Sequence, residues 1–131
     1  MTVGELARRT GVRPSAVRYY ERLGLIPVPP RRSGRRDYGP EAFAHLAVVQ
    51  FARTCGFTLA ETKQLVRGFD PRTAASARWN TLTESKLREI DALIERAQVM
   101  KDLLNRIGRC QCETLIECGQ RLHRHFHAGD L

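Results

Sequence analysis

The feature that most constrains this chain is a stripe of apolar residues whose spacing alternates between three and four. It lies within residues 76–118 and consists of Ile90, Leu93, Ala97, Met100, Leu104 and Ile107, preceded in the same register by Trp79, Thr83 and Lys86. This alternation keeps side chains on one face of a single α-helix, as in the seam of a coiled coil. Such a helix of about 30 residues would be roughly 45 Å long, which is longer than a domain of this size can normally pack against along its whole length. The pattern therefore predicts a partner helix, most simply the same helix of a second copy, with an intramolecular bundle as the alternative.

Positive charge is concentrated in the first half of the chain. Of the 131 residues, 1–72 contain 13 Lys and Arg against 6 Asp and Glu, whereas 73–131 contain 9 against 8, within a net charge of +8. A basic segment of this kind favours a polyanionic partner, most often nucleic acid, although a solvated basic face is the simpler alternative. The chain has no run of 18 apolar residues and no leader in which an apolar stretch follows charges. We therefore expect a cytoplasmic protein without a membrane partner.

Two short helices joined by a tight glycine turn are predicted at the start of the chain. Thr2 and Glu5 fit a capping box, and Gly11 can close the first helix in a left-handed conformation. Pro14 suits the first position of the second helix. Groups on that helix that could reach DNA phosphates or base edges are Ser15, Arg18, Tyr19 and Arg22. The pattern is typical of a helix-turn-helix.

Prolines and Gly34 exclude a continuing helix over residues 27–38, so this segment is predicted to be an extended loop or a two-stranded wing. Four arginines crowd its tip: Arg31, Arg32, Arg35 and Arg36. Beside a helix-turn-helix, such a tip favours a clamp on the DNA backbone over a merely solvated loop.

Two further helices are expected before the long one. Pro40 opens the first, with a buried face predicted for Phe43, Leu46, Val48, Val49 and Phe51, and Thr58 with Glu61 forms a second capping box. Cys55, between these helices and far from the other cysteines, is predicted to be a small core residue.

Three cysteines lie close together after the long helix. Cys110, Cys112 and Cys118 follow Gly108, a natural helix stop, so their thiols are expected on a loop. Thiols this dense in a chain without a secretion leader indicate metal or redox chemistry rather than a disulfide framework. No Cys-x-x-Cys motif is present and no acid or base partner accompanies the cysteines, so a thiol oxidoreductase is a weak alternative.

Several motifs in order and spacing closely resemble the MerR family of bacterial transcription regulators. They are Thr2–Ala7, Val17–Glu21, Gly24–Ile26, Arg36–Tyr38 and Gly56–Leu59. The resemblance implies a winged helix-turn-helix, an antiparallel coiled-coil homodimer and a C-terminal effector loop. It also implies that effector binding distorts promoter DNA to realign it for RNA polymerase. By position, Arg18, Tyr19 and Tyr20 correspond to the recognition-helix signature, and Arg36 and Tyr38 to the wing.

The effector follows from comparing the cysteine loop with branches of that family. The spacing of Cys110 and Cys118 is similar to that of copper(I) sensors, and Ser76 stands near the position where the mercury sensor has a third cysteine. Both points favour Cu(I) or Ag(I), with Hg(II), Pb(II) or Cd(II) on three thiolates as an alternative. The three cysteines also match three of the four in the iron–sulfur branch, but the fourth position is Ile107, which disfavours a [2Fe–2S] cluster.

A histidine tail follows the cysteines. His123 and His127 would share one face of a helix and could complete a zinc site, with His125 between them, whereas a disordered terminus is the simpler alternative.

Together these features predict a mainly α-helical protein in three parts. Residues 1–72 form the winged helix-turn-helix DNA-binding domain, residues 73–109 the dimerisation helix, and residues 110–131 the cysteine loop with a short helix or tail. The predicted function is a dimeric, non-enzymatic transcription regulator that senses a soft metal ion and binds promoter DNA. The main alternative is a thiol-based or iron–sulfur redox sensor, and an architectural DNA binder with structural zinc is a further one. The region after Cys118 is too short for an organic-ligand pocket domain.

Overall fold

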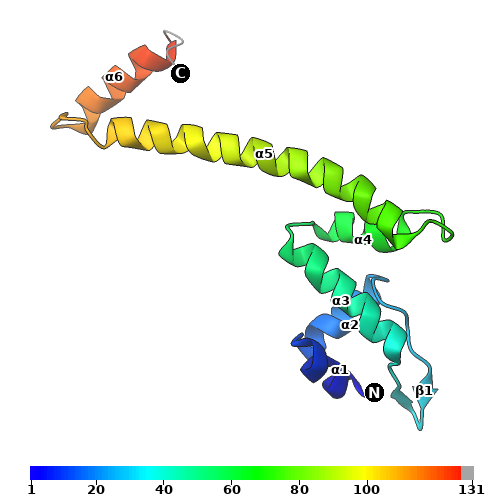
Figure 1. Cartoon of the computed structure of the whole chain (residues 1–131). Helices are drawn as coiled ribbons and strands as arrows, with labels where there is room; N and C mark the ends of the chain where they lie inside the picture. Colours follow the sequence, from blue (N-terminus) through cyan, green and yellow to red (C-terminus); the bar gives the residue numbers. More distant parts are fainter. Residues whose placement is uncertain (128–131) are drawn as a thin grey trace. The chain divides into compact units, whose positions relative to one another are not determined.

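The computed structural model describes the backbone of residues 1–127 and the side chains of residues 1–125. The chain forms two compact units, Met1–Arg88 and Glu89–Leu131. The described elements are α1 (Val3–Thr10), α2 (Pro14–Arg22), β1 (Arg31–Arg32), β2 (Arg35–Arg36), α3 (Pro40–Thr54), α4 (Leu59–Arg67), α5 (Ala75–Ile107) and α6 (Leu115–His127); all but β2 are labelled in Figure 1. The predicted fold class, mainly helical with a small wing, is confirmed.

Helices α1 and α2 form a helix-turn-helix for the reasons their sequences suggest. The Thr2 hydroxyl accepts a hydrogen bond from the backbone N–H of Glu5 at 3.1 Å, which caps the start of α1. Gly11 ends α1 with φ 73°, a left-handed conformation that other residues rarely adopt. Pro14 opens α2. Both helices pack on one core through Leu6, Ala7 and Val17.

The wing is a two-stranded antiparallel hairpin, in which Arg31 pairs with Arg36 and Arg32 with Arg35. Ser33 and Gly34 form its turn, with φ 53° and 76°. Positive φ at both central residues gives the backbone twist that joins two antiparallel strands tightly. The hairpin form of the wing, one of two predicted alternatives, is therefore the one adopted.

The buried face of α3 differs in part from the prediction. Leu46 and Val49 are buried as expected, together with Ala42 and Ala52. Phe43 and Phe51 are 39% and 60% exposed, so their assignment to the buried face is wrong. The small residues Ala42 and Ala52 occupy inward positions instead, one in each core cluster.

Cys55 is exposed, and its assignment to the core is wrong. It ends α3, where its backbone N–H donates to the carbonyl of Phe51, and its side chain lies outside the packed face. Phe57, two residues later, enters the core instead.

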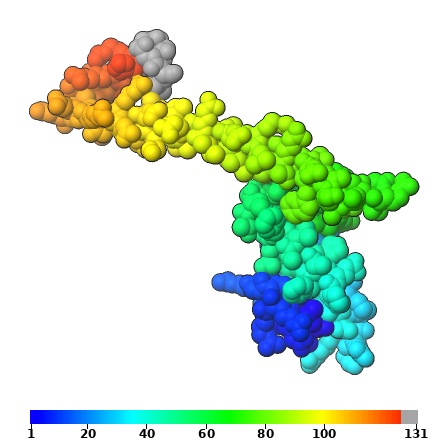
Figure 2. Space-filling view, in the orientation of Figure 1, coloured from blue at the N-terminus to red at the C-terminus, as the bar shows by residue number. Residues whose placement is uncertain are grey.

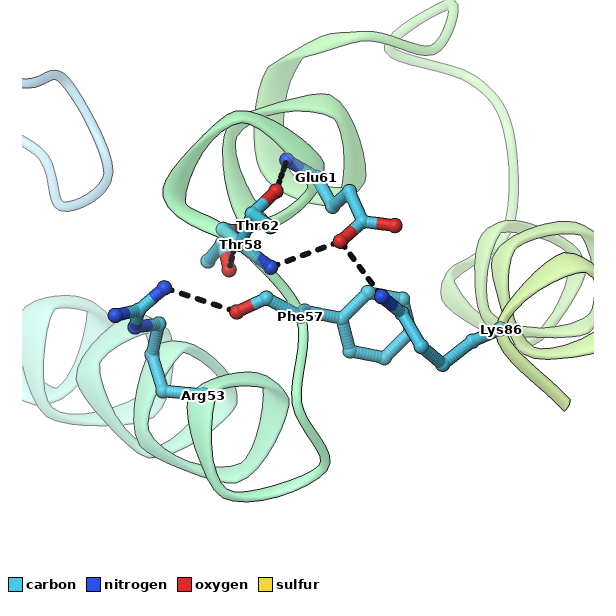
Figure 3. A network of polar contacts seen from close by, with 6 residues as sticks. All are labelled: Arg53, Phe57, Thr58, Glu61, Thr62 and Lys86. Carbon is cyan, nitrogen blue, oxygen red and sulfur yellow. Dashed lines mark hydrogen bonds and ion pairs between the residues drawn. The ribbon is translucent and has the colours of Figure 1, made fainter. Parts of the chain in front are cut away.

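Helix α4 is held at both ends by side chains from the first turns of α5. At its N-terminus both hydrogen bonds of the Thr58–Glu61 capping box form, and the Lys86 ammonium lies 2.8 Å from Glu61 Oε1 and 5.4 Å from the centre of the Phe57 ring (Figure 3). At its C-terminus the Arg78 guanidinium donates to the carbonyls of Leu65 and Val66. Residues 75–88 of α5 therefore belong to the N-terminal unit.

Two residues predicted for the coiled-coil seam serve this internal packing. Lys86 is only 6% exposed, and Trp79 packs edge-to-face on Phe51 and Phe57 at 5.9 Å. Leu82, one helical turn after Trp79, is also buried in this cluster. The first half of the seam register thus contributes to the core of the N-terminal unit.

The second half of α5 carries the apolar stripe on its surface. No residue between 91 and 102 is buried within the described part of the chain, and Leu93 and Leu104 are 57% and 66% exposed. Figure 2 shows side chains of this part of α5, coloured yellow, at the surface. The described chain thus gives no support to the intramolecular bundle.

Candidate functional site

Some of the residues of α2 predicted to contact DNA are exposed, and others are partly buried. Ser15, Arg18 and Tyr19 are exposed, so their side chains are accessible to a ligand. The Arg22 guanidinium lies 5.9 Å from the centre of the Tyr19 ring. Tyr20 is half-buried and packs against the α1–α2 core. The helix therefore presents one polar face formed mainly by its first turns.

Tyr38 and Arg36 both donate hydrogen bonds to one buried carboxylate, that of Glu21. Tyr38 is 1% exposed, and its hydroxyl donates to Glu21 Oε1 at 3.0 Å. The Arg36 Nε donates to the other oxygen, Glu21 Oε2, at 3.1 Å. Burial and the bond to Glu21 raise the pKa of Tyr38 to about 12, so the hydroxyl stays protonated at neutral pH. The structure thus places Tyr38 in the core, where it joins the wing to α2.

Glu21 was not among the residues expected to matter, although a signal for it exists. It follows Val17 by four positions and so lies on the buried face of α2, where an acidic residue requires partners. Arg31, Arg32 and Arg35 are exposed, together with the outer part of Arg36. The wing therefore offers a cluster of accessible guanidinium groups.

The three C-terminal cysteines converge in the second unit. Their sulfur atoms all lie within 4.8 Å of one another. Cys110 and Cys112 are on the loop after α5, whereas Cys118 lies in the first turns of α6 rather than on the loop. Thr114 caps α6 by accepting from the backbone N–H of Glu117 at 3.1 Å, which fixes the turn that carries Cys118.

Hydrogen bonds among these thiols give them different acidities. The backbone N–H of Cys112 donates to the Cys110 sulfur at 3.3 Å. Hydrogen bonds from the Cys112 thiol and N–H lower the pKa of Cys110, and the same thiol contact, with burial, raises the pKa of Cys112 to about 11. Of these two thiols, Cys110 is therefore the more acidic.

The cysteines open onto a groove of about 610 Å³. Its walls include Leu103, Leu104, Leu122, Arg106, Arg121, His125 and Ile107. Ile107 thus faces the site without supplying a sulfur. His125 lines the groove but is not in the described group of donors within 4.8 Å, which consists of the three sulfurs. His123 is not among the wall residues, and the side chain of His127 lies outside the described residues.

The donor set fits a soft metal ion. Thiolate sulfur is the ligand that such ions prefer, and an ion bonded at about 2.3 Å to three sulfurs requires sulfur–sulfur distances of about 4 Å. The observed upper limit of 4.8 Å needs only a small contraction to reach that spacing.

Comparison with known proteins assigns the family. The model described as MerR HTH family regulatory protein matches residues 1–68, and the model described as MerR, DNA binding matches residues 43–107. The chain belongs to the MerR family. The predicted resemblance is thereby confirmed. As a MerR family member the chain is a DNA-binding transcription regulator and not an enzyme, as expected.

Relatives within the MerR family span nearly the whole chain. The transcriptional regulator CueR of Escherichia coli O6:H1 is 34% identical over 121 residues, covering 90% of this chain and 89% of the relative. The mercuric resistance operon regulatory protein of Bacillus cereus is 34% identical over 119 residues, covering 88% and 90%.

A solved structure of another transcription regulator agrees with the fold. The transcription regulator PbrR691 from Ralstonia metallidurans CH34, in complex with lead(II), matches with a TM-score of 0.73 at 26% identity. The match covers 87% of this chain and 91% of that one. In the described residues, none of the helices is both long and apolar enough to cross a membrane.

Proposed function

We propose that this MerR family regulator is a homodimer that senses a soft metal ion through Cys110, Cys112 and Cys118 and transmits the signal to promoter DNA. The observation that carries this proposal is the convergence of three sulfurs within 4.8 Å in a chain whose opposite end is a DNA-binding unit. Relatives named or titled for mercury and lead support a metal effector.

The DNA-reading surface is proposed to combine α2 and the wing. Ser15, Arg18 and Tyr19 project from the exposed face of α2, which suits base edges and phosphates in the major groove. Arg35 and its neighbours on the wing suit the phosphate backbone beside it. Tyr20 and Tyr38 serve by holding this surface in place rather than by touching DNA.

Dimerisation is proposed to occur through the exposed stripe of α5. The seam register runs from Trp79 to Ile107, with Leu93 at its midpoint. Trp79 and Lys86 in this register also pack within their own unit, so the exposed stripe follows Lys86. An antiparallel pair centred on Leu93 sets Trp79 opposite Ile107 of the partner subunit, and Ser76 opposite Cys110 of the partner subunit. The cysteine site of one subunit would then lie beside the start of α5 in the other. In that arrangement, ion binding in one subunit would act directly on the start of α5 in the second subunit, which belongs to that subunit's DNA-binding unit.

Copper(I) and silver(I) are the first candidates for the ion. The seven residues between Cys110 and Cys118 match the spacing of copper(I) sensors, and CueR is among the relatives. Zinc(II), mercury(II) and other divalent ions remain candidates because a third sulfur lies beside the pair. A [2Fe–2S] cluster is less favoured because Ile107 offers no ligand.

Elemental analysis and an absorption spectrum of the full chain, purified without oxygen, test the proposal together with footprinting on its promoter. We expect a colourless dimer that binds the ion stoichiometrically, and an ion-dependent change in the cleavage pattern at the centre of the footprint. In transcription with RNA polymerase, the ion should change promoter output. A red-brown protein with stoichiometric iron and sulfide would instead support the redox-sensing alternative. A footprint unaffected by any ion would support an architectural role.

A further inference from the structure

Two opposite charges border one side of the apolar stripe of α5. Glu89 stands directly before Ile90, and Arg96 stands directly before Ala97, so both lie on the same flank of the helix. Glu89 is four residues before Leu93 and Arg96 is three residues after it, so the two charges lie at almost equal distances from the proposed midpoint of the seam. Both side chains are exposed.

The helix itself offers Arg96 no acidic neighbour. Side chains on a helix surface meet when they stand three or four positions apart. At these distances from Arg96 all the side chains are apolar, namely Ala92, Leu93, Val99 and Met100. In the described part of the chain Arg96 takes part in no ion pair. Its guanidinium is therefore available to an acidic group of a second chain.

The orientation of a helix pair decides which flanks face each other. In an antiparallel pair the same flank of both helices meets, whereas in a parallel pair opposite flanks meet. In an antiparallel pair centred on Leu93, Glu89 therefore lies beside Arg96 of the partner subunit, and the two-fold axis repeats this contact. In a parallel pair, Arg96 would instead lie beside Lys101 of the partner subunit, which carries a like charge.

The opposite flank carries apolar residues in the middle of the stripe. Leu87 and Ile94 stand there and are 55% and 63% exposed, so they widen the apolar surface that a second helix could cover. Burial of apolar surface is non-directional and stabilises a helix pair without choosing its partner or orientation. In this part of α5 that choice is therefore left to Glu89 and Arg96.

We propose that Glu89 and Arg96 select a second copy of this chain as the dimerisation partner, because each forms an ion pair with the other residue of an antiparallel copy. The inference rests on the proposed dimer seam and names the residues that give the seam its specificity. Self-pairing is favoured because this chain carries one charge of each sign on the flank. A chain of the same fold with two like charges there would be matched only by a chain with two opposite ones.

Charge reversal should convert self-pairing into mixed pairing. Arg96→Glu carries two acidic residues on the flank and Glu89→Arg carries two basic ones, so each variant repels itself and attracts the other. The two full-length variants, one of them isotope-labelled, are mixed, allowed to exchange subunits and analysed by native mass spectrometry. We expect mixed dimers to form about nine-tenths of the population, as a roughly 10-fold weakening of each homodimer gives, where random pairing gives about half.

The outer face of the same helix supplies matched control variants. Arg88 and Glu95 each stand one residue earlier than the proposed pair, carry opposite charges at the same spacing and lie away from the stripe. Arg88→Glu and Glu95→Arg change the net charge by the same amounts and should mix at random. In about 1 M salt, which screens charges beyond about 3 Å, the preference of the flank variants for mixed dimers should shrink. Circular dichroism checks that all variants keep their helices.

A double reversal tests the choice of partner directly. The variant that combines Glu89→Arg with Arg96→Glu again carries one charge of each sign, so it should pair with itself as tightly as the wild type does. Against the wild type it presents like charges at both contacts. We expect mixed dimers of this variant with the wild type to fall to about a tenth of the population.

The results also separate this proposal from the dimer on which it rests. Random mixing of the flank variants, with dimers throughout, would refute the role of Glu89 and Arg96 and leave a dimeric regulator intact. A tighter homodimer of Arg96→Glu would overturn the proposal in favour of the parallel orientation, in which the new carboxylate faces Lys101 of the partner subunit. A monomeric wild type would refute the proposed dimer and this inference with it.

Discussion

At the scale of single residues, the buried Glu21 explains more of the DNA-binding unit than any exposed arginine. Its two oxygens accept from Arg36, at the end of the wing's second strand, and from Tyr38, in the segment that follows it. The carboxylate therefore connects the wing to α2. A wing loosely attached to the recognition helix could not hold its arginines at a defined distance from the bases that α2 reads.

Removal of the Tyr38 hydroxyl should destabilise this connection. In Tyr38→Phe a buried acceptor loses one of its donors, which costs about 1–3 kcal/mol or more when the acceptor is charged. We expect the midpoint of urea unfolding to fall accordingly. Tyr19→Phe is the control, because Tyr19 is exposed on α2. Removal of its hydroxyl should leave the unfolding midpoint unchanged while weakening DNA binding. Equal midpoints for the two variants would contradict the role given to Tyr38.

The same contact predicts a loss of stability in alkali. The pKa of Tyr38 is raised from its ordinary value of 10 to about 12 in the folded state. A group whose pKa is higher when folded stabilises the protein fully below its unfolded pKa and loses that contribution as pH rises through the folded value. Stability from Tyr38 should therefore decline between pH 10 and pH 12. Urea unfolding of the wild type and Tyr38→Phe across this range should show the difference between them shrinking.

At the scale of elements, α4 owes its position to cations from α5. Lys86 contacts Glu61 at the N-terminus of α4 (Figure 3). Arg78 contacts the last carbonyls of α4, where a cation also complements the helix dipole. A helix of nine residues is marginal by itself in water. Its stability therefore comes from these contacts and from the packing of Thr62 and Leu65.

Lys86→Met should show what the ion pair contributes. An exposed pair contributes up to about 1 kcal/mol, and removing one partner from a fully buried pair costs about 3–5 kcal/mol. Lys86 is buried but Glu61 is partly exposed, so we expect a loss between these limits, about 1–2 kcal/mol. Arg88→Met is the matched control, because its contact with Glu84, at 3.7 Å, is exposed. Thermal unfolding of both variants checks this prediction. If Lys86→Met loses no more stability than Arg88→Met, the internal role of Lys86 is refuted.

Along the second half of α5, a charge in the apolar stripe should separate the subunits. Leu93 is exposed at the proposed midpoint of the seam, so Leu93→Asp places two carboxylates near each other in the dimer. We expect a monomer in analytical ultracentrifugation at micromolar concentration. Val99 is equally apolar and 52% exposed but lies off the stripe, so Val99→Asp should remain dimeric. A dimeric Leu93→Asp would place the interface elsewhere.

At the scale of the whole molecule, local patterns predicted the elements well and their burial less well. Caps, glycines and prolines located the helices near Thr2, Pro14 and Thr58 because these signals act within a few residues. The cysteine cluster was also recognisable from spacing. Neither the exposure of Phe51 nor the burial of Lys86 could be read from periodicity, because each depends on how α5 packs against α3 and α4.

This packing predicts where the chain can be divided. The predicted DNA-binding domain ends at residue 72, but Trp79 and Leu82 complete its second core cluster, and the compact unit continues to Arg88. A fragment of residues 1–88 should unfold cooperatively in circular dichroism, whereas residues 1–72 should lose α4 and unfold at lower temperature. The 1–88 fragment should also bind DNA more weakly than the full chain, because it lacks the proposed dimer seam. Identical melting curves would show that α5 adds nothing to this unit.

Helix α5 runs without interruption from Ala75 to Ile107, through the boundary between the two units at Arg88 and Glu89. Each residue of an α-helix advances the chain by about 100° around its axis. One residue inserted at that boundary would therefore turn the seam and the cysteine loop by that angle relative to the face that holds α4. An insertion of seven residues, close to two full turns, would restore the phase and only lengthen the helix. The continuous helix should therefore tolerate changes in length by whole heptads, which preserve the helical phase between the seam and the face that holds α4. Single insertions or deletions, which change that phase, should abolish the response to metal.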